Sequence, residues 1–225
     1  MKTKNALVTA FIIIVSLIIT NVSFSKSESE GKPEKKHISE VHANNSSSAE
    51  DLRTGMRQLW EDHIVWTRNV ILCLVDGLPG TDQAVDRLLK NQVDIGDAIK
   101  PYYGNEAGEK LTGLLKPHIT IAAEVVTAAK KGDKTALDDA NKRWHANAEE
   151  ISVFLSSANP NWKLEDIKSM MNDHLKLTTD EAVARIQKDY NADITAYDKV
   201  HEEILMMADH LSDGIIKQFP DKFKK

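Results

Sequence analysis

The segment "DLRTGMRQLWEDHIVWTRNVILCLVD" (residues 51–76) decides the fold, because apolar residues return in it at every third or fourth position. This spacing places them along one face of an α-helix, whereas a half-buried strand would alternate apolar and polar residues. The same period continues to the end of the chain, and no stretch alternates over a useful length. The sequence therefore predicts an all-α bundle of about six helices.

Turn residues separate most of the predicted helices. Thr81 is the expected N-cap of the second, and Pro117 predicts a kink in the third or its division at Lys116. The pattern "TTDE" (178–181) resembles a capping box that starts the sixth. That helix would be ~58 Å long, so we expect a kink or break within it. The predicted helices cover about 51–76, 82–100, 106–131, 134–157, 163–176 and 179–217.

Residues 1–25 have the pattern of a secretory signal peptide. Lys2 and Lys4 precede an apolar run at residues 6–20, and small residues follow it at the spacing of a cleavage site. The apolar run is short for a membrane-spanning helix, which needs about 20 residues. We therefore expect an extracytoplasmic protein that is secreted or, if the signal stays uncleaved, tethered to the membrane by residues 6–24.

The remaining chain divides into a linker and one folded domain. Residues 26–50 are rich in Ser, Lys, Glu and Asn, so they are expected to form a flexible linker. Residues 51–225 are long enough for a single core, as a monomer or a homodimer. The formal net charge of −5 argues against nucleic acid as a partner. Cys73 is the only cysteine, so stability is expected to come from the core without a disulfide.

Two kinds of internal similarity predict a duplicated helical unit. The segment "TDQAVDRLLKNQVDI" (81–95) resembles "TDEAVARIQKDYNADI" (179–194). A frame of two apolar residues, two spacers, a histidine and then Ile or Leu occurs four times. Duplicated helical units tend to pack with pseudo-two-fold symmetry, which would bring equivalent histidines together in the bundle. The four frames are "LWEDHI" (59–64), "LLKPHI" (114–119), "MMNDHL" (170–175) and "MMADHL" (206–211).

The repeated histidines predict a central binding site. Imidazole is a good ligand for Zn, Cu and Fe, and helical bundles build metal and cofactor sites from inward side chains. We therefore predict a binding protein with a histidine-lined pocket for a transition metal or a small molecule. The predicted metal ligands are His63, His118, His174 and His210, and the predicted cofactor-binding residues are Gln92, Asp193, Tyr197 and His201.

Two alternatives remain open at the level of sequence. The first is a structural or interaction module, in which each histidine bonds a neighbour in the core and no ligand is bound. The second is an enzyme that uses histidine as a metal ligand or as an acid and base. No residue pattern assigns a catalytic role, because the chain lacks the glycine-rich, nucleophile and zinc-protease motifs.

Five segments of the folded region carry a resemblance: "LWEDHIVWTR" (59–68), "NQVDIGDAIKPYYG" (91–104), "LKPHITIAAE" (115–124), "DHLKLTTDEAVAR" (173–185) and "YDKVHEEILMMAD" (197–209). They resemble a family of small bacterial helical proteins that has no established activity. Members of that family sometimes carry a glycosyltransferase label. The usual sugar-nucleotide transferase needs an α/β nucleotide-binding fold, and the helical pattern here disfavours that label. The resemblance implies an all-α fold and implies that the histidine-containing segments are important to the protein.

Overall fold

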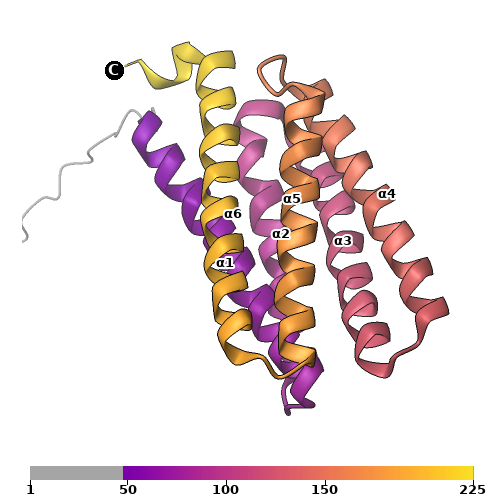
Figure 1. Cartoon of the computed structure of the whole chain (residues 1–225). Helices are drawn as coiled ribbons and strands as arrows, with labels where there is room; N and C mark the ends of the chain where they lie inside the picture. The colour runs from indigo at the N-terminus through magenta and orange to yellow at the C-terminus, as the bar shows by residue number, and fades with distance from the viewer. Residues whose placement is uncertain (1–47, 225) are drawn as a thin grey trace, which may run out of the picture. The chain divides into compact units, whose positions relative to one another are not determined.

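The computed structural model describes residues 48–224, which contain α-helices, one short 3-10 helix and no strand, so the predicted all-α fold is confirmed (Figure 1). The predicted signal peptide lies outside the described residues, as does the predicted linker except for its last three residues. No helix in the described part combines the length and apolar character that a bilayer crossing requires. The elements are α1 (Ala49–Asp76), α2 (Thr81–Tyr103), α3 (Asn105–Lys131), α4 (Lys134–Ala158), α5 (Leu164–Ile186), α6 (Tyr190–Gln218) and η1 (Pro220–Phe223).

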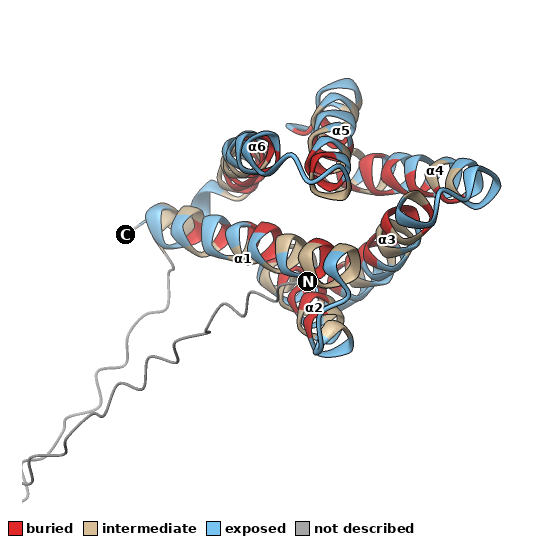
Figure 2. Ribbon diagram, turned by 60° about the horizontal axis from the view of Figure 1, so that its bottom comes forward, coloured by how far each residue is buried: buried red, intermediate tan, exposed pale blue. Residues whose placement is uncertain are grey.

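The six helices form a closed ring. Each helix packs against the next along the chain, and α6 returns to pack against α1. The helices α1, α3 and α5 also contact one another, so they surround the centre of the bundle. Figure 2 shows the buried residues on the helix sides that face this interior. The bundle can therefore be described as three hairpins, α1–α2, α3–α4 and α5–α6.

Several helix ends are fixed by capping residues and by glycines. Ser48 caps α1 in a capping box with Asp51. Gly77 and Gly132 end α1 and α3 with φ values of 67° and 68°, in the left-handed region that glycine tolerates best. Asp133 then caps α4 by accepting a hydrogen bond from the backbone N–H of Ala136.

Three details of α2 and α3 differ from prediction. Gly80 precedes α2 without a side-chain cap, and the Thr81 hydroxyl instead donates to the Leu78 carbonyl at 2.9 Å. The helix α2 also continues through Pro101 to Tyr103. The helix α3 runs through Pro117 as one element, so the predicted division there is wrong. Proline removes one backbone hydrogen bond, and this position is exposed, so water can satisfy the carbonyl left free.

The boundary between the last two helices is also corrected. The helix α5 continues through residues 178–181, and the chain breaks at 187–189, where Lys188 has a φ of 61° and Asp189 caps α6. A break in the long predicted helix therefore exists, but it lies about ten residues beyond the capping-box pattern. Thr178 and Glu181 are both buried within the bundle. They serve tertiary contacts, and these override the local capping pattern.

Two glycines bring α2 and α3 into backbone contact. A Cβ atom added to Gly96 would lie 2.6 Å from the carbonyl oxygen of Gly108 and 2.0 Å from Oγ1 of Thr112. Backbone cannot move aside as a flexible side chain can. The absence of a side chain at Gly96 is therefore a requirement of this helix pair.

We expect Gly96→Ala to lower the free energy of unfolding by about 1–3 kcal/mol, because α2 and α3 must separate to admit the methyl group. The matched control is Gly113→Ala on the exposed side of α3, where no atom lies within 4 Å of the new Cβ. It should raise the same free energy by up to about 1 kcal/mol through helix propensity. Urea denaturation measures both, and equal behaviour of the two variants would contradict the close approach.

Candidate functional site

Three of the four predicted histidines meet in the interior. His63, His118 and His174 lie on the inner helices α1, α3 and α5, and each is at most 4% exposed. The ring centroids of His63 and His174 are 5.7 Å apart. His210 lies on α6, and no contact within residues 48–224 joins it to the other three. Its Nε2 atom is buried without a hydrogen-bond partner.

Each of the three interior histidines is held by a polar side chain 29 residues further along the chain. His63 Nδ1 lies 3.2 Å from Gln92 Nε2, and His118 Nδ1 lies 2.8 Å from Asn147 Oδ1. In the third pair, His174 Nδ1 lies 3.0 Å from Glu203 Oε2. Each pair links the two helices of one hairpin.

The structural repeat is therefore a hairpin that occurs three times. The three histidines follow one another at intervals of 55 and 56 residues, each on the first helix of its hairpin. The segments 81–95 and 179–194 are not equivalent, because the first lies within α2 and the second spans the break between α5 and α6. His210 lies 36 residues after His174, and the same offset in the other hairpins leads to Ile99 and Phe154. The fourth frame is thus outside the repeat.

His118 has both ring nitrogens satisfied. The Asn147 amide donates through Nδ2 to the Leu114 carbonyl at 3.0 Å, which leaves Oδ1 to accept a proton from His118 Nδ1. His118 Nε2 in turn accepts the Trp144 indole N–H at 3.2 Å. Burial, together with the nearby His174, lowers the pKa of His118 to about 3. His118 is therefore a neutral, fully bonded core histidine at physiological pH.

His63 and His174 differ in the bonds that their Nδ1 atoms make. The two protons of Gln92 Nε2 are donated to the Leu88 carbonyl at 2.9 Å and to Asn91 Oδ1 at 3.0 Å, so its 3.2 Å contact with His63 Nδ1 does not fix the tautomer of that ring. His174 Nδ1 donates to the Glu203 carboxylate. Burial lowers the pKa of His63 well below its usual value, and the neighbouring imidazoles lower it further. Gln92 Oε1, Glu203 Oε1 and Trp60 Nε1 are buried without a partner. Buried polar atoms of this kind normally bond ordered water or a ligand.

No metal centre is preformed around these histidines. Within residues 48–224, no three or more His, Cys, Asp or Glu side chains are arranged to hold a metal ion. The prediction of a transition metal on His63, His118, His174 and His210 stays a prediction. Its strongest remaining pair is His63 and His174, because their rings are close and each is anchored through Nδ1.

An apolar cavity of about 120 Å³ lies one helical turn beyond the histidines. Its wall includes the fourth residue after each of them, Thr67, Ala122 and Thr178. The histidines themselves do not line it. All five helices from α1 to α5 contribute, and the wall carries no charged side chain. The lining residues are Thr67, Val70, Ile71, Leu88, Ile119, Ala122, Ala123, Val125, Val126, Ala129, Leu137, Asn141, Trp144, Thr178, Thr179, Ala182, Val183 and Ile186.

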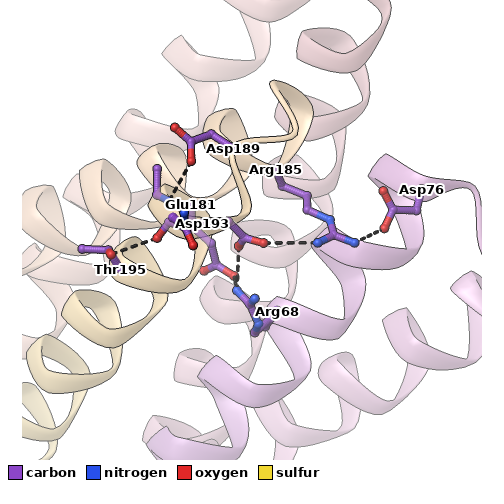
Figure 3. A network of polar contacts seen from close by, with 9 residues as sticks. Arg68, Asp76, Glu181, Arg185, Asp189, Asp193 and Thr195 are labelled. Atoms are coloured by element: carbon purple, nitrogen blue, oxygen red, sulfur yellow. Dashed lines mark hydrogen bonds and ion pairs between the residues drawn. The ribbon is translucent and has the colours of Figure 1, made fainter.

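A buried ion-pair network joins α1, α5 and α6 (Figure 3). Arg68 Nη1 lies 2.7 Å from Glu181 Oε1 and 2.8 Å from Asp193 Oδ1. Arg185 Nη1 contacts the other oxygen of Asp193 at 3.3 Å, and Arg185 also pairs with Asp76. The carboxyl side chains of Glu181 and Asp193 are 1% exposed. Desolvation raises the pKa of Glu181 to about 7, although Arg68 opposes the rise.

The predicted cofactor-binding residues fall in three places. Gln92 holds His63, as described above. Asp193 and Tyr197 belong to the ion-pair network, where the Arg68 guanidinium stacks 4.7 Å from the Tyr197 ring centroid. His201 is partly exposed and contacts Glu61 at 3.3 Å, away from the interior histidines. Of these four residues, Gln92 is the one with a described contact to a predicted metal ligand.

Several interior polar residues were missed from the sequence. Asn147 and Glu203 each lie 29 residues after a histidine, as Gln92 does, so this fixed spacing would have identified them. Arg68 carried no comparable signal, because a lone arginine on a helix is usually solvated. Glu181 was assigned to a cap, which concealed its place in the core.

The comparisons with known proteins add no relative to this geometry. Neither protein-family models, nor curated proteins, nor solved structures gave a match to the chain. The resemblance to small bacterial helical proteins therefore stays a prediction. What this chain does has to be inferred from the bundle interior itself.

Proposed function

We propose that the protein binds a small, largely apolar molecule in the interior cavity. The observation that carries this proposal is the cavity itself, of about 120 Å³ with an almost entirely apolar wall. An engineered cavity of roughly 150 Å³ in another protein, lined by aliphatic and aromatic residues, binds benzene or xenon. A molecule of about that size therefore suits this one. The leader-like sequence of residues 1–25 supports binding outside the cytoplasm.

The cavity is costly as a packing defect. Protein interiors are normally close-packed, and unfilled apolar volume forgoes packing contacts. A single substitution could fill the cavity, because a larger apolar side chain at Ala122 or Ala182 would occupy the empty volume. The small residues that keep it open support a binding role.

Benzene and xenon are the probes for this proposal. At ten times its Kd a ligand adds about 1.4 kcal/mol to the stability, which raises the Tm by roughly 3–5 °C for a domain of this size. Ala122→Leu should abolish this shift by filling the cavity, whereas Ala146→Leu on an exposed position of α4 should leave it intact. No shift with either probe in the unmodified chain, or an equal shift in the Ala122→Leu variant, would refute the proposal.

A second candidate function is transition-metal binding by His63 and His174, whose ring centroids are 5.7 Å apart. Metal-ligating histidines usually donate their other ring N–H to a carboxylate or carbonyl oxygen, as His174 does here to Glu203. Zn²⁺, Cu²⁺ and Fe²⁺ form further arms of the same thermal-shift experiment. A shift that His174→Phe abolishes and Ala122→Leu preserves would identify this function. Absence of any metal-dependent shift would exclude it.

A further inference from the structure

We infer that the ligand of the cavity is uncharged and carries a single hydroxyl or carbonyl group, which bonds to the Thr178 hydroxyl. The inference rests on the proposed function and specifies the class of ligand. A benzene-sized ring or a short branched chain would fill the apolar volume. Phenol is the simplest molecule that combines these features.

The hydroxyl and indole groups of the cavity wall are mostly bonded to the protein, and its one side-chain amide, that of Asn141, is only partly buried, so water can satisfy it. The Thr67 hydroxyl donates to the carbonyl oxygen of His63 at 2.7 Å, and the Thr179 hydroxyl donates to that of Leu175 at 2.8 Å. The Trp144 indole N–H is bonded to a histidine, as described above. These groups can shape the cavity, but they have no donor proton left for a ligand.

Thr178 is the exception. Its side chain lines the cavity, the residue is 5% exposed, and its hydroxyl oxygen is buried with no hydrogen-bond partner. A buried hydroxyl without a partner costs free energy that a partner would recover. Threonine in the middle of a helix usually donates to the carbonyl four residues earlier, as Thr67 and Thr179 do. Thr178 leaves that bond unmade, so its hydroxyl is available to a bound molecule.

The same wall excludes charged ligands. It contains no Asp, Glu, Lys, Arg or His side chain that would neutralise a carboxylate or an ammonium. Moving an ionised group from water into such a site is strongly unfavourable unless a partner compensates it. A hydroxyl is both donor and acceptor, so Thr178 can accept the proton of a phenol or donate to a carbonyl. A neutral ligand with one polar group therefore matches the site.

The experiment compares the Kd of benzene, phenol and benzoate for the full chain and for matched variants by isothermal titration calorimetry. Thr178→Val keeps the side-chain shape and removes the hydroxyl, so it should weaken phenol binding about 5- to 10-fold and leave benzene binding unchanged or tighter. Thr179→Val is the control, because its hydroxyl is already engaged. It should leave the ratio of the two Kd values unchanged, as should Thr178→Ser, which retains the hydroxyl. Benzoate should not bind.

The outcomes separate this inference from the proposed function. If benzene and phenol lose affinity equally in Thr178→Val, or if benzoate binds as tightly as phenol, the inferred ligand class is wrong and the cavity remains a binding site. If neither benzene nor phenol binds the unmodified chain, the proposed function fails and the inference fails with it. A nuclear magnetic resonance shift of the Thr178 methyl group on addition of phenol supplies a second readout that does not depend on a variant.

Discussion

Replacing Arg68 by Met is expected to lower the free energy of unfolding by about 3–5 kcal/mol, because it leaves two buried carboxylates without their shared cation. Arg68 lies within 2.8 Å of both Glu181 and Asp193, and each carboxylate is 1% exposed. Methionine preserves much of the apolar stem of arginine, so the effect reports the charge more than the packing. Urea denaturation at pH 8, where Glu181 is largely ionised, measures the change.

The matched control is Arg57→Met. Arg57 forms a bidentate pair with Asp209, with distances of 2.6 and 2.5 Å, but both side chains are well exposed. An exposed pair contributes about 0–1 kcal/mol, so this variant should change little. Because Glu181 can take up a proton when Arg68 is absent, the penalty of Arg68→Met should shrink at pH 5. A loss below 1 kcal/mol at pH 8 would contradict the assignment of Arg68 as the cation that stabilises the network.

Stability is expected to depend on pH in two opposing ways. His63 and His118 have folded pKa values depressed below the ordinary 6.5, so the unfolded chain takes up protons first as the pH falls. The stabilisation that these two neutral histidines contribute is fully present above pH 6.5 and is lost as the pH falls below 6.5. Glu181 behaves in the opposite way, because its folded pKa of about 7 lies above the ordinary 4.5. The folded state then binds the extra proton between pH 4.5 and 7, and stability falls as the pH rises through that window.

The sum of these three groups gives a maximum near pH 6.5. Between pH 6.5 and 4.5 two histidines outweigh one glutamate, so the unfolded state binds more protons than the folded state and stability falls as the pH falls. Below pH 4.5 stability falls more steeply, because Glu181 no longer opposes the histidines. Denaturant midpoints measured from pH 8 to pH 4 test this profile.

Glu181→Gln isolates the opposing contribution. Glutamine cannot titrate, so the slope between pH 6.5 and 4.5 should become about twice as steep, and the decline towards pH 7 should disappear. The Arg68–Asp193 pair remains in this variant. An unchanged slope would show that Glu181 does not hold the proton, and a stability that is flat down to pH 4 would show that the two histidines are not kept neutral by burial.

The helices were predictable from sequence because their apolar faces repeat over many turns. Four of the six helices begin and end close to the predicted positions, and His63, His118 and His174 were correctly placed on inward faces. The last two helices were divided at the wrong point. The sequence there offers a capping box but no glycine at the true break, and only the tertiary contact of Glu181 with Arg68 distinguishes a cap from a core residue.

The candidate site was predictable in part. The recurrence of the histidine frame indicated that histidines would gather in the interior, and three do. His210 has the same frame but lies on the second helix of its hairpin, which periodicity within a single helix cannot reveal. The cavity could not be predicted, because its volume depends on how five helices pack together. Even the choice of Thr178 as its free polar group depends on a rotamer.

The 29-residue spacing between each interior histidine and its partner also bears on how the chain assembles. Each of these contacts closes a loop of the same length, and it lies within one hairpin. One of the contacts that close the ring, between Arg57 and Asp209, spans 152 residues. Loop-closure entropy grows with the logarithm of length, so the longer loop costs about 1.5 kcal/mol more to close when no hairpin has yet formed. If the three hairpins fold first, the loop that remains to be closed is shorter. The histidine contact within each hairpin then favours the correct pairing of its two helices.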